Sequence, residues 1–275
     1  MQIGNAEFDF NHHTYVMGIL NVTPDSFSDG GKWNSEDSAL KHVEDMIAQG
    51  AAIIDVGGES TRPGFVQVSE EEEIHRTAPI IEKIKRTFGI PVSIDTWKAT
   101  VAGAAIDAGA DLINDVTGLF GDAQMGRVIA ERKVPCCLMH NGQYITHAQN
   151  GMQRYMDLLC EDMQQILNKA QEAGIAKEKM ILDPGVGFGK TQEENAEILA
   201  NLGDLQTLGY SLLLGTSRKS VIGYLLDLPV DQRVEGTLVT SMLAAQAGYD
   251  FVRVHDVREN YRVIQMVEAL RKWTR

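Results

Sequence analysis

Short apolar runs alternate with longer amphipathic segments along most of the chain. Residues 16–20 are apolar, and the polar residue Asn21 and a loop rich in turn residues follow them. A run of this length, bounded by turn residues, is typical of a strand that is buried on both faces. Between the runs, apolar residues recur at the spacing of one helix face, as in Ile74, Ile81 and Ile84. The pattern therefore predicts buried parallel strands joined by amphipathic helices.

This strand-then-helix unit is repeated eight times. Asn34 or Ser35 is expected to cap the first helix, because both side chains can accept a hydrogen bond from the first helical turn. Eight such units in about 250 residues are typical of a closed α/β fold, the TIM (β/α)8 barrel. An open doubly wound sheet is the alternative. The expected strands are residues 15–21, 52–56, 91–95, 111–115, 134–140, 179–183, 211–215 and 251–256.

Ahead of the first strand, Ile3, Phe8 and Phe10 are separated by polar positions and by the turn residues Gly4 and Asn5. Short alternating segments on either side of a glycine turn predict a small β-hairpin. No shift in composition divides the rest of the chain. We therefore expect one domain over residues 1–275, in which this short N-terminal hairpin is followed by the barrel.

The balance of charge argues against two classes of partner. The chain has 38 acidic and 25 basic residues, a formal net charge of −13. Nucleic acid and anionic membranes are bound through clustered lysine and arginine, so neither is an expected partner. The first residues contain neither a basic start nor a long apolar run, and no segment has the ~18 apolar residues of a membrane span. These features predict a cytoplasmic protein.

The three cysteines do not form a framework of disulfides or zinc ligands. Cys136 and Cys137 are neighbours on an expected strand, where successive side chains point to opposite faces. Cys160 lies in an expected helix, and no spacing of cysteine and histidine matches a zinc site. All three are expected to be reduced core residues.

Polar side chains gather where the expected strands end. In a barrel of this kind the carboxyl ends of the strands meet at one face, and the active site lies there. Asp95 and Asp115 could instead cap helices or loops, and Asp183 before Pro184 could simply begin a turn. Arg253 and His255 alternate along one strand and need an anion or a carboxylate nearby. The residues brought to this face are Asn21, Asp55, Asp95, Asn114, Asp183, Arg253 and His255, with Ser60, Thr61, Arg62, Ser217 and Lys219 on adjoining loops.

The glycine-rich segment 185–190 does not match a nucleotide-binding loop. A phosphate-binding P-loop would require glycine where Pro184 stands, and the dinucleotide fingerprint would require glycine where Lys190 stands. Neither nucleotide site is predicted.

Seven segments, taken together, resemble the motifs of the dihydropteroate synthase family, in the same order and over nearly the whole chain. The segments are NVTPDSFSDGG (21–31), GESTRPG (58–64), SIDT (93–96), INDV (113–116), DPGVGFGK (183–190), SRKS (217–220) and RVHD (253–256).

The resemblance implies an enzyme that joins 6-hydroxymethyl-7,8-dihydropterin diphosphate to p-aminobenzoate, giving 7,8-dihydropteroate and diphosphate. It implies Mg²⁺, bound by Asn21, and a homodimer. The arylamine nucleophile is neutral at pH 7, so catalysis is expected from stabilisation of the departing diphosphate. Sulfonamides, which mimic p-aminobenzoate, are expected to compete for its pocket.

The site residues follow from the same resemblance. Asp95, Asn114, Met139, Asp183 and Lys219 are expected to hold the pterin, with Arg253 stacked on its ring. The chemistry agrees, because a carboxylate can accept two hydrogen bonds from adjacent N–H groups of a pterin edge. Asn21, Thr61, Arg253 and His255 are expected to bind the diphosphate, and Asp95, Lys219, Arg253 and His255 to act in catalysis. The p-aminobenzoate pocket is expected to contain Phe27, Thr61, Arg62, Pro63, Phe188, Ser217 and Lys219.

Two alternatives remain open at this point. A barrel that binds methyltetrahydrofolate for methyl transfer would share the pterin site, but it would lack the two hydroxyl-rich loops 21–31 and 58–64 and would need a corrinoid partner. A non-catalytic barrel that senses a phosphorylated ligand would retain Arg253 and His255 but would not require Asn21.

Overall fold

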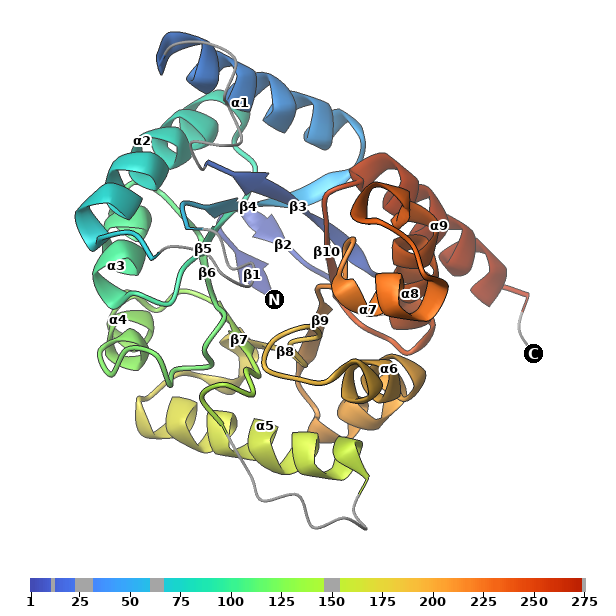
Figure 1. Ribbon diagram of the computed structural model, residues 1–275. Coiled ribbons are helices and arrows are strands. Elements are labelled where there is room, and N and C mark those ends of the chain that lie inside the picture. The colour runs from blue at the N-terminus through green and yellow to red at the C-terminus, as the bar shows by residue number, and fades with distance from the viewer. Residues whose placement is uncertain (11–12, 23–31, 60–66, 146–153, 274–275) are drawn as a thin grey trace.

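Eight parallel strands form a closed barrel in the computed structural model, which describes residues 1–10, 13–22, 32–59, 67–145 and 154–273 (Figure 1). Strand β10 pairs with both β9 and β3, and this double pairing closes the sheet. The expected (β/α)8 barrel is confirmed, and the alternative of an open doubly wound sheet is wrong. The barrel strands are β3 Tyr15–Asn21, β4 Ala51–Gly57, β5 Val92–Asp95, β6 Leu112–Asp115, β7 Cys136–Met139, β8 Met180–Asp183, β9 Ser211–Leu214 and β10 Phe251–Val254.

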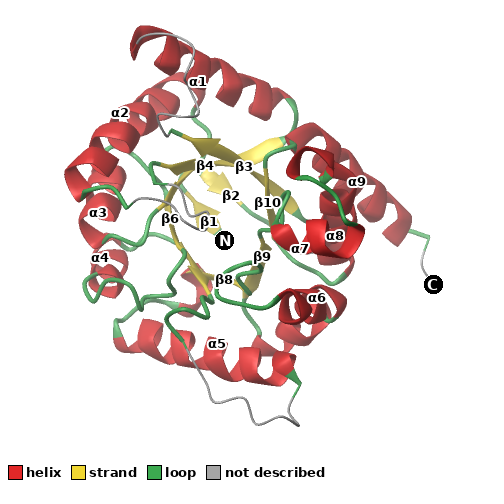
Figure 2. Ribbon diagram, viewed as in Figure 1, coloured by secondary structure: helices red, strands yellow, loops and turns green. Residues whose placement is uncertain are grey.

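Helices surround the barrel and cover the outer faces of its strands (Figure 2). Two of them, α7 and α8, both lie between β9 and β10. The expectation that Asn34 or Ser35 caps the first helix is wrong, because α1 begins at Lys32 and both residues lie inside it. The helices are α1 Lys32–Ala48, α2 Glu70–Phe88, α3 Ala99–Asp107, α4 Met125–Arg132, α5 Tyr155–Glu172, α6 Gln192–Ala200, α7 Ser220–Leu226, α8 Val234–Gln246 and α9 Val257–Arg271, with 3-10 turns at Lys177–Lys179, Leu202–Leu208 and Val230–Gln232.

The expected N-terminal hairpin is confirmed. Strands β1 (Gln2–Ile3) and β2 (Ala6–Glu7) pair antiparallel around Gly4, whose φ of 58° suits glycine. Ile3 and Phe8 are fully or almost fully buried and pack against the apolar side chains inside the barrel. The hairpin therefore closes one end of the barrel, as its place within the ring of strands in Figure 1 shows.

The interior of the barrel has an apolar layer and a polar layer. Side chains two residues apart on a strand point to the same face. Along β10, buried Phe251 is therefore followed on the inner face by Arg253, and along β4 Ile53 is followed by Asp55. The carboxyl end of the barrel is thus lined with polar groups. The apolar layer consists of Met17, Ile53, Leu112, Cys137, Ile181, Leu213 and Phe251.

Cys136 and Cys137 are buried core residues as expected, whereas Cys160 is only half-buried and packs against the core. Cys136 belongs to the core between strands and helices, whereas its neighbour Cys137 belongs to the core inside the barrel. All three cysteines are free, and burial raises the pKa of each thiol. Separately, none of the helices in the described ranges is long and apolar enough to cross a bilayer.

Candidate active site

Arg253 lies between two carboxylates at the carboxyl end of the barrel. Its Nε donates to Oδ2 of Asp55 at 2.5 Å, and its Nη2 donates to Oδ2 of Asp95 at 2.6 Å. Burial opposes the charge on Arg253, but the two carboxylates outweigh it and raise the pKa of the guanidinium. Asp95 is thus a partner of Arg253 and not a helix cap; Lys98, three residues later, is the residue that precedes α3.

Asp95 and Asp55 share this one cation inside the barrel. Burial raises the pKa of Asp95 to about 7; Arg253 opposes this rise, and the neighbouring Asp55 adds to it. Asp55 also accepts a hydrogen bond from Nδ2 of Asn114 at 3.3 Å. One oxygen of each carboxylate, Oδ1, is buried without a hydrogen-bond partner among the described residues. Such unpartnered acceptors are typical of a site that receives N–H donors from a ligand.

Asp183 has the turn role that the sequence allowed, and its second carboxylate oxygen lies at the mouth of the barrel. Its Oδ1 accepts from the backbone N–H of Gly185 at 2.7 Å, which shapes the turn after β8. Its Oδ2 lies 3.4 Å from the position that a Cβ on Gly215 would occupy, and Nζ of Lys219 lies 3.9 Å from the same position. Burial raises the pKa of Asp183 and lowers that of Lys219 to about 8. Asp183, Lys219 and Arg253 therefore converge beside a glycine.

Asp115 is different, because its hydrogen bonds among the described residues all go to its own loop. It accepts from the N–H and hydroxyl of Thr117 and from the N–H of Leu119. This is the loop-capping role that was the alternative for Asp115.

Lys219 is held by the loop that follows β8. Its Nζ donates to the carbonyl of Val186 at 2.6 Å and lies 4.5 Å from the centre of the Phe188 ring. An ammonium over an aromatic face is attracted to it. The residues predicted for the pterin and for p-aminobenzoate thus meet at Lys219.

Ser217 and His255 are also in contact. The Ser217 hydroxyl accepts from the backbone N–H of His255 at 3.1 Å and lies 3.0 Å from its Nδ1. His255 itself lies one residue beyond β10, so the expectation that it belongs to the strand is wrong. Strand ends are set by the last ladder hydrogen bond, which the sequence pattern does not mark. The residues predicted for p-aminobenzoate and for diphosphate are neighbours here.

Asn21 and Met139 end β3 and β7, whereas five other predicted residues lie outside the described ranges. Met139 is buried and pairs in register with Asp183, and Oδ1 of Asn21 lies 3.5 Å from the position of a Cβ on Gly57. Phe27, Thr61, Arg62 and Pro63 lie outside the described residues, as does Ser60.

Residues 17–255 match the family described as pterin binding enzyme. The chain is 56% identical over 271 residues to the dihydropteroate synthase of Clostridium beijerinckii, covering 98% of this chain and 99% of that protein. The chain belongs to the dihydropteroate synthase family of pterin-binding enzymes.

Solved structures of the family share this fold. A dihydropteroate synthase from Clostridium difficile, determined in the presence of pteroic acid, superposes with a TM-score of 0.90 at 48% identity, covering 96% of this chain and 99% of that one. The enzyme from Xanthomonas albilineans in complex with 7,8-dihydropteroate gives a TM-score of 0.86 at 36% identity, covering 96% and 95%. The chain is therefore an enzyme of this family, a transferase, and the methyltransferase and sensor alternatives are set aside.

The role of one residue at the barrel mouth has no signal in the sequence. Asp55 is expected at the mouth without a function, whereas in the structure it is a direct partner of both Arg253 and Asn114. Alternation along β4 puts Asp55 on the inner face, but nothing in the sequence tells which side chain across the barrel it will meet.

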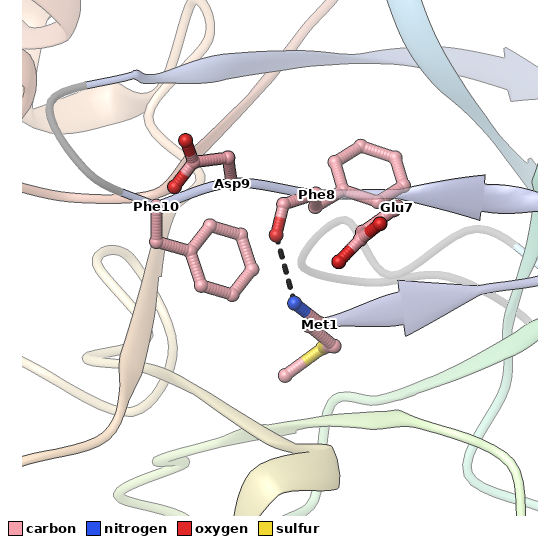
Figure 3. Close-up of a pocket in the computed structure, with 5 residues that line it drawn as sticks. All are labelled: Met1, Glu7, Phe8, Asp9 and Phe10. Atoms are coloured by element: carbon pink, nitrogen blue, oxygen red, sulfur yellow. Dashed lines mark hydrogen bonds between the residues drawn. The ribbon is translucent and has the colours of Figure 1, made fainter.

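A cavity at the opposite end of the barrel contains none of the predicted site residues. It has a volume of about 700 Å³ and is lined by Met1, Glu7, Phe8, Asp9 and Phe10. Figure 3 shows its one drawn hydrogen bond, from the Met1 amine to the carbonyl of Phe8 at 2.7 Å. The chemistry of the family is therefore expected at the carboxyl ends of the strands, where the charged groups converge.

Proposed function

We propose that the enzyme condenses 6-hydroxymethyl-7,8-dihydropterin diphosphate with p-aminobenzoate, with the help of Mg²⁺, and releases 7,8-dihydropteroate and diphosphate. The observation that carries this proposal is the convergence of Asp95, Asp183, Lys219 and Arg253 at the polar end of the barrel. Binding of p-aminobenzoate and dihydropteroate by solved relatives, both from Xanthomonas albilineans, supports the same substrate class.

In this proposal the polar residues at the carboxyl ends of the barrel strands recognise the pterin. Asp183 accepts from adjacent N–H groups of the pterin edge, Asn114 both donates and accepts, and Met139 supplies an apolar contact. Asp95 has a buried oxygen without a partner among the described residues, which suits a further pterin N–H. Lys219 donates to a ring acceptor and remains close to the Phe188 ring.

The cationic groups act on the leaving group. Arg253 stacks on the pterin ring and reaches the diphosphate, and His255 and Thr61 donate to its oxygens. Positive charge placed where negative charge develops stabilises the transition state for loss of diphosphate. The arylamine then attacks the electron-poor methylene carbon of the pterin and loses its proton to solvent. Phe27, Thr61, Arg62, Pro63, Phe188, Ser217 and Lys219 hold the p-aminobenzoate.

Mg²⁺ fits the donor set at Asn21. Mg²⁺ in phosphate-transferring enzymes often has one or two protein oxygens, and substrate phosphates and waters complete its shell. The described residues contain no cluster of three or more histidine, cysteine, aspartate or glutamate side chains that could hold a metal. The amide oxygen of Asn21, at the end of β3, therefore suits an ion that arrives with the diphosphate. Once bound, Mg²⁺ would neutralise charge on the leaving group.

The test is product formation with matched controls. We would incubate the purified protein with both substrates, with Mg²⁺ or with EDTA, and measure dihydropteroate by mass spectrometry. Product should require Mg²⁺ and should fall at least about 100-fold in Asp183→Asn and Arg253→Ala, because each loses charge-assisted contacts in a buried site. The exposed residues Asp157 and Arg127 provide the controls Asp157→Asn and Arg127→Ala, which should retain full activity. Absence of product in the wild type, with Mg²⁺ present, would refute the proposal.

The remaining expectations are part of the same proposal. We infer a homodimer, a cytoplasmic location and one domain over residues 1–275. Exposed apolar side chains on α7 and α9, among them Tyr224, Leu225, Met266 and Leu270, give a dimer a surface to bury. Light scattering after gel filtration should give about twice the chain mass of 30.3 kDa.

A further inference from the structure

The ammonium of Lys190 lies inside the loop formed by the glycine-rich segment 185–190, whose glycines do not match a nucleotide-binding motif. Its Nζ donates to three backbone carbonyls: Gly185 at 2.8 Å, and His140 and Phe188 at 3.1 Å each. An ammonium has three N–H donors, and a carbonyl can only accept. All three donors of Lys190 are therefore used within the protein.

These three carbonyls come from two different loops. His140 follows β7, whereas Gly185 and Phe188 follow β8. The two loops approach so closely that a Cβ on Gly185 would lie 1.8 Å from the carbonyl oxygen of His140. Backbone hydrogen bonds from Gly142 to Phe188 and from His140 to Asp183 join them as well. Lys190 thus neutralises the carbonyl dipoles at the junction of the loops.

The same loop holds the site lysine. The carbonyl of Val186 accepts from Nζ of Lys219, and the ring of Phe188 lies beside that Nζ. Lys190 binds the carbonyls of Gly185 and Phe188, and Val186 lies between these two residues in the chain. A shift of the loop would therefore move both groups that contact Lys219.

Lys190 occupies this position at an electrostatic cost. Burial lowers the pKa of Lys190 to about 7, and the negative charge of Asp183 opposes that effect. A half-buried cation with no carboxylate among these three hydrogen-bond acceptors is destabilising unless its donors are satisfied. A neutral side chain of equal length would avoid this cost but would leave three carbonyls without a donor.

We propose that Lys190 is a positioning residue for the proposed reaction: its ammonium fixes residues 185–188 against the loop after β7 and so sets the place of Lys219. This inference rests on the proposed function, but it can be tested separately. Lys190 is not expected to touch either substrate.

The kinetic test compares Lys190→Met, which removes the donors, with Lys190→Arg, whose planar guanidinium keeps the charge but cannot direct three N–H groups to converging carbonyls. Lys272→Met, at an exposed position, is the control. We expect kcat/KM for p-aminobenzoate to fall at least about tenfold in Lys190→Met and less in Lys190→Arg, and to stay unchanged in Lys272→Met. The assay is run well below the Tm of each variant, so that loss of folded protein does not contribute.

A double-mutant cycle distinguishes positioning from general stabilisation. If Lys190 acts through Phe188, Lys190→Met should lower kcat/KM much less in a Phe188→Ala background than in the wild type. Additive losses, or a kcat/KM of folded Lys190→Met within twofold of wild type, would overturn the proposal. If Lys190→Met does not fold, an unchanged kcat/KM in Lys190→Arg overturns it instead.

Hydrogen exchange tests the loop without any activity. The N–H of Phe188 donates to Gly185, and that of Gly187 donates to Asn195 at 2.6 Å. Both amides should exchange at least about tenfold faster in Lys190→Met than in the wild type or Lys272→Met. Unchanged exchange rates would refute the role of Lys190, whereas a wild type that makes no dihydropteroate would refute only the proposed function.

Discussion

Nη2 of Arg253 lies 2.6 Å from Oδ2 of Asp95, so two residues that are 158 positions apart in the chain form an ion pair across the mouth of the barrel. In the proposed reaction both residues have other partners, the diphosphate and the pterin. In the structure, the guanidinium of Arg253 is bound by the protein's own carboxylates. Asp55 on the other side of the guanidinium completes the arrangement.

Asp55 should matter for activity although it is not among the residues predicted to touch substrate. We expect Asp55→Asn to lower kcat/KM for the pterin substrate about tenfold or more, because a hydrogen bond to a charged group contributes roughly 1.5–3 kcal/mol and this one orients Arg253. Steady-state kinetics measure the effect, with Asp157→Asn as the control. A variant with the kinetics of the wild type would show that Asp95 alone holds Arg253.

Asp95 should make the folded state less stable as the pH rises. Its pKa is about 7 in the folded protein and 3.8 when unperturbed, so the folded state binds more protons between these values. The stability that the neutral carboxyl contributes is complete below pH 3.8 and is lost as the pH rises to about 7.

The matching variant is Asp95→Asn, which does not titrate. Its stability relative to the wild type should rise as the pH is raised from 4 to 8, while its activity is lost. Urea denaturation from pH 4 to 8 measures the difference, and Asp157→Asn should show no such trend. If the difference in unfolding free energy between Asp95→Asn and wild type does not change with pH, burial does not raise the pKa of Asp95 in the folded protein.

The fold could be predicted from the sequence because each strand repeats one local signal. Eight apolar runs ending in polar residues require eight buried parallel strands, and the inward alternation then fixes which side chains reach the mouth, as for Asn114 and Arg253. Strand ends could not be predicted to the residue, as His255 shows. Pairs across the barrel, such as Asp55 with Arg253, depend on register and barrel closure and have no local signal.

The buried lysine at the start of α3 should contribute strongly to stability. Nζ of Lys98 donates to Glu59 at 2.8 Å and Glu73 at 2.7 Å, and all three side chains are buried. Removing one partner leaves uncompensated charge inside the protein, so Lys98→Met should cost about 3–5 kcal/mol of the free energy of unfolding.

Two comparisons test this explanation for Lys98. Arg127→Ala breaks the exposed pair with Glu131 and should cost no more than about 1 kcal/mol. Burial raises the pKa of Glu73, so acidification protonates this carboxylate first, and the difference in unfolding free energy between Lys98→Met and wild type should narrow towards pH 5. Chemical denaturation at pH 5 and pH 7.5 gives both values, and a gap that widens at pH 5 would contradict the charge argument.

Gly185 should tolerate no side chain, for two reasons that can be separated. Its φ is 66°, where an L-residue is strained by about 1–2 kcal/mol, and a Cβ would also lie 1.8 Å from the carbonyl oxygen of His140. Gly174 has a φ of 84° but no atom within 4 Å of a Cβ. Gly174→Ala should therefore show the backbone strain alone, whereas Gly185→Ala should cost at least about 3 kcal/mol, because the loops after β7 and β8 must separate.

Since those loops hold Lys219 through Val186, Gly185→Ala should also lose dihydropteroate formation while Gly174→Ala retains it. Equal changes in Tm for the two variants would mean that the loops can part without cost, and that the packing of His140 on Gly185 does not define the site.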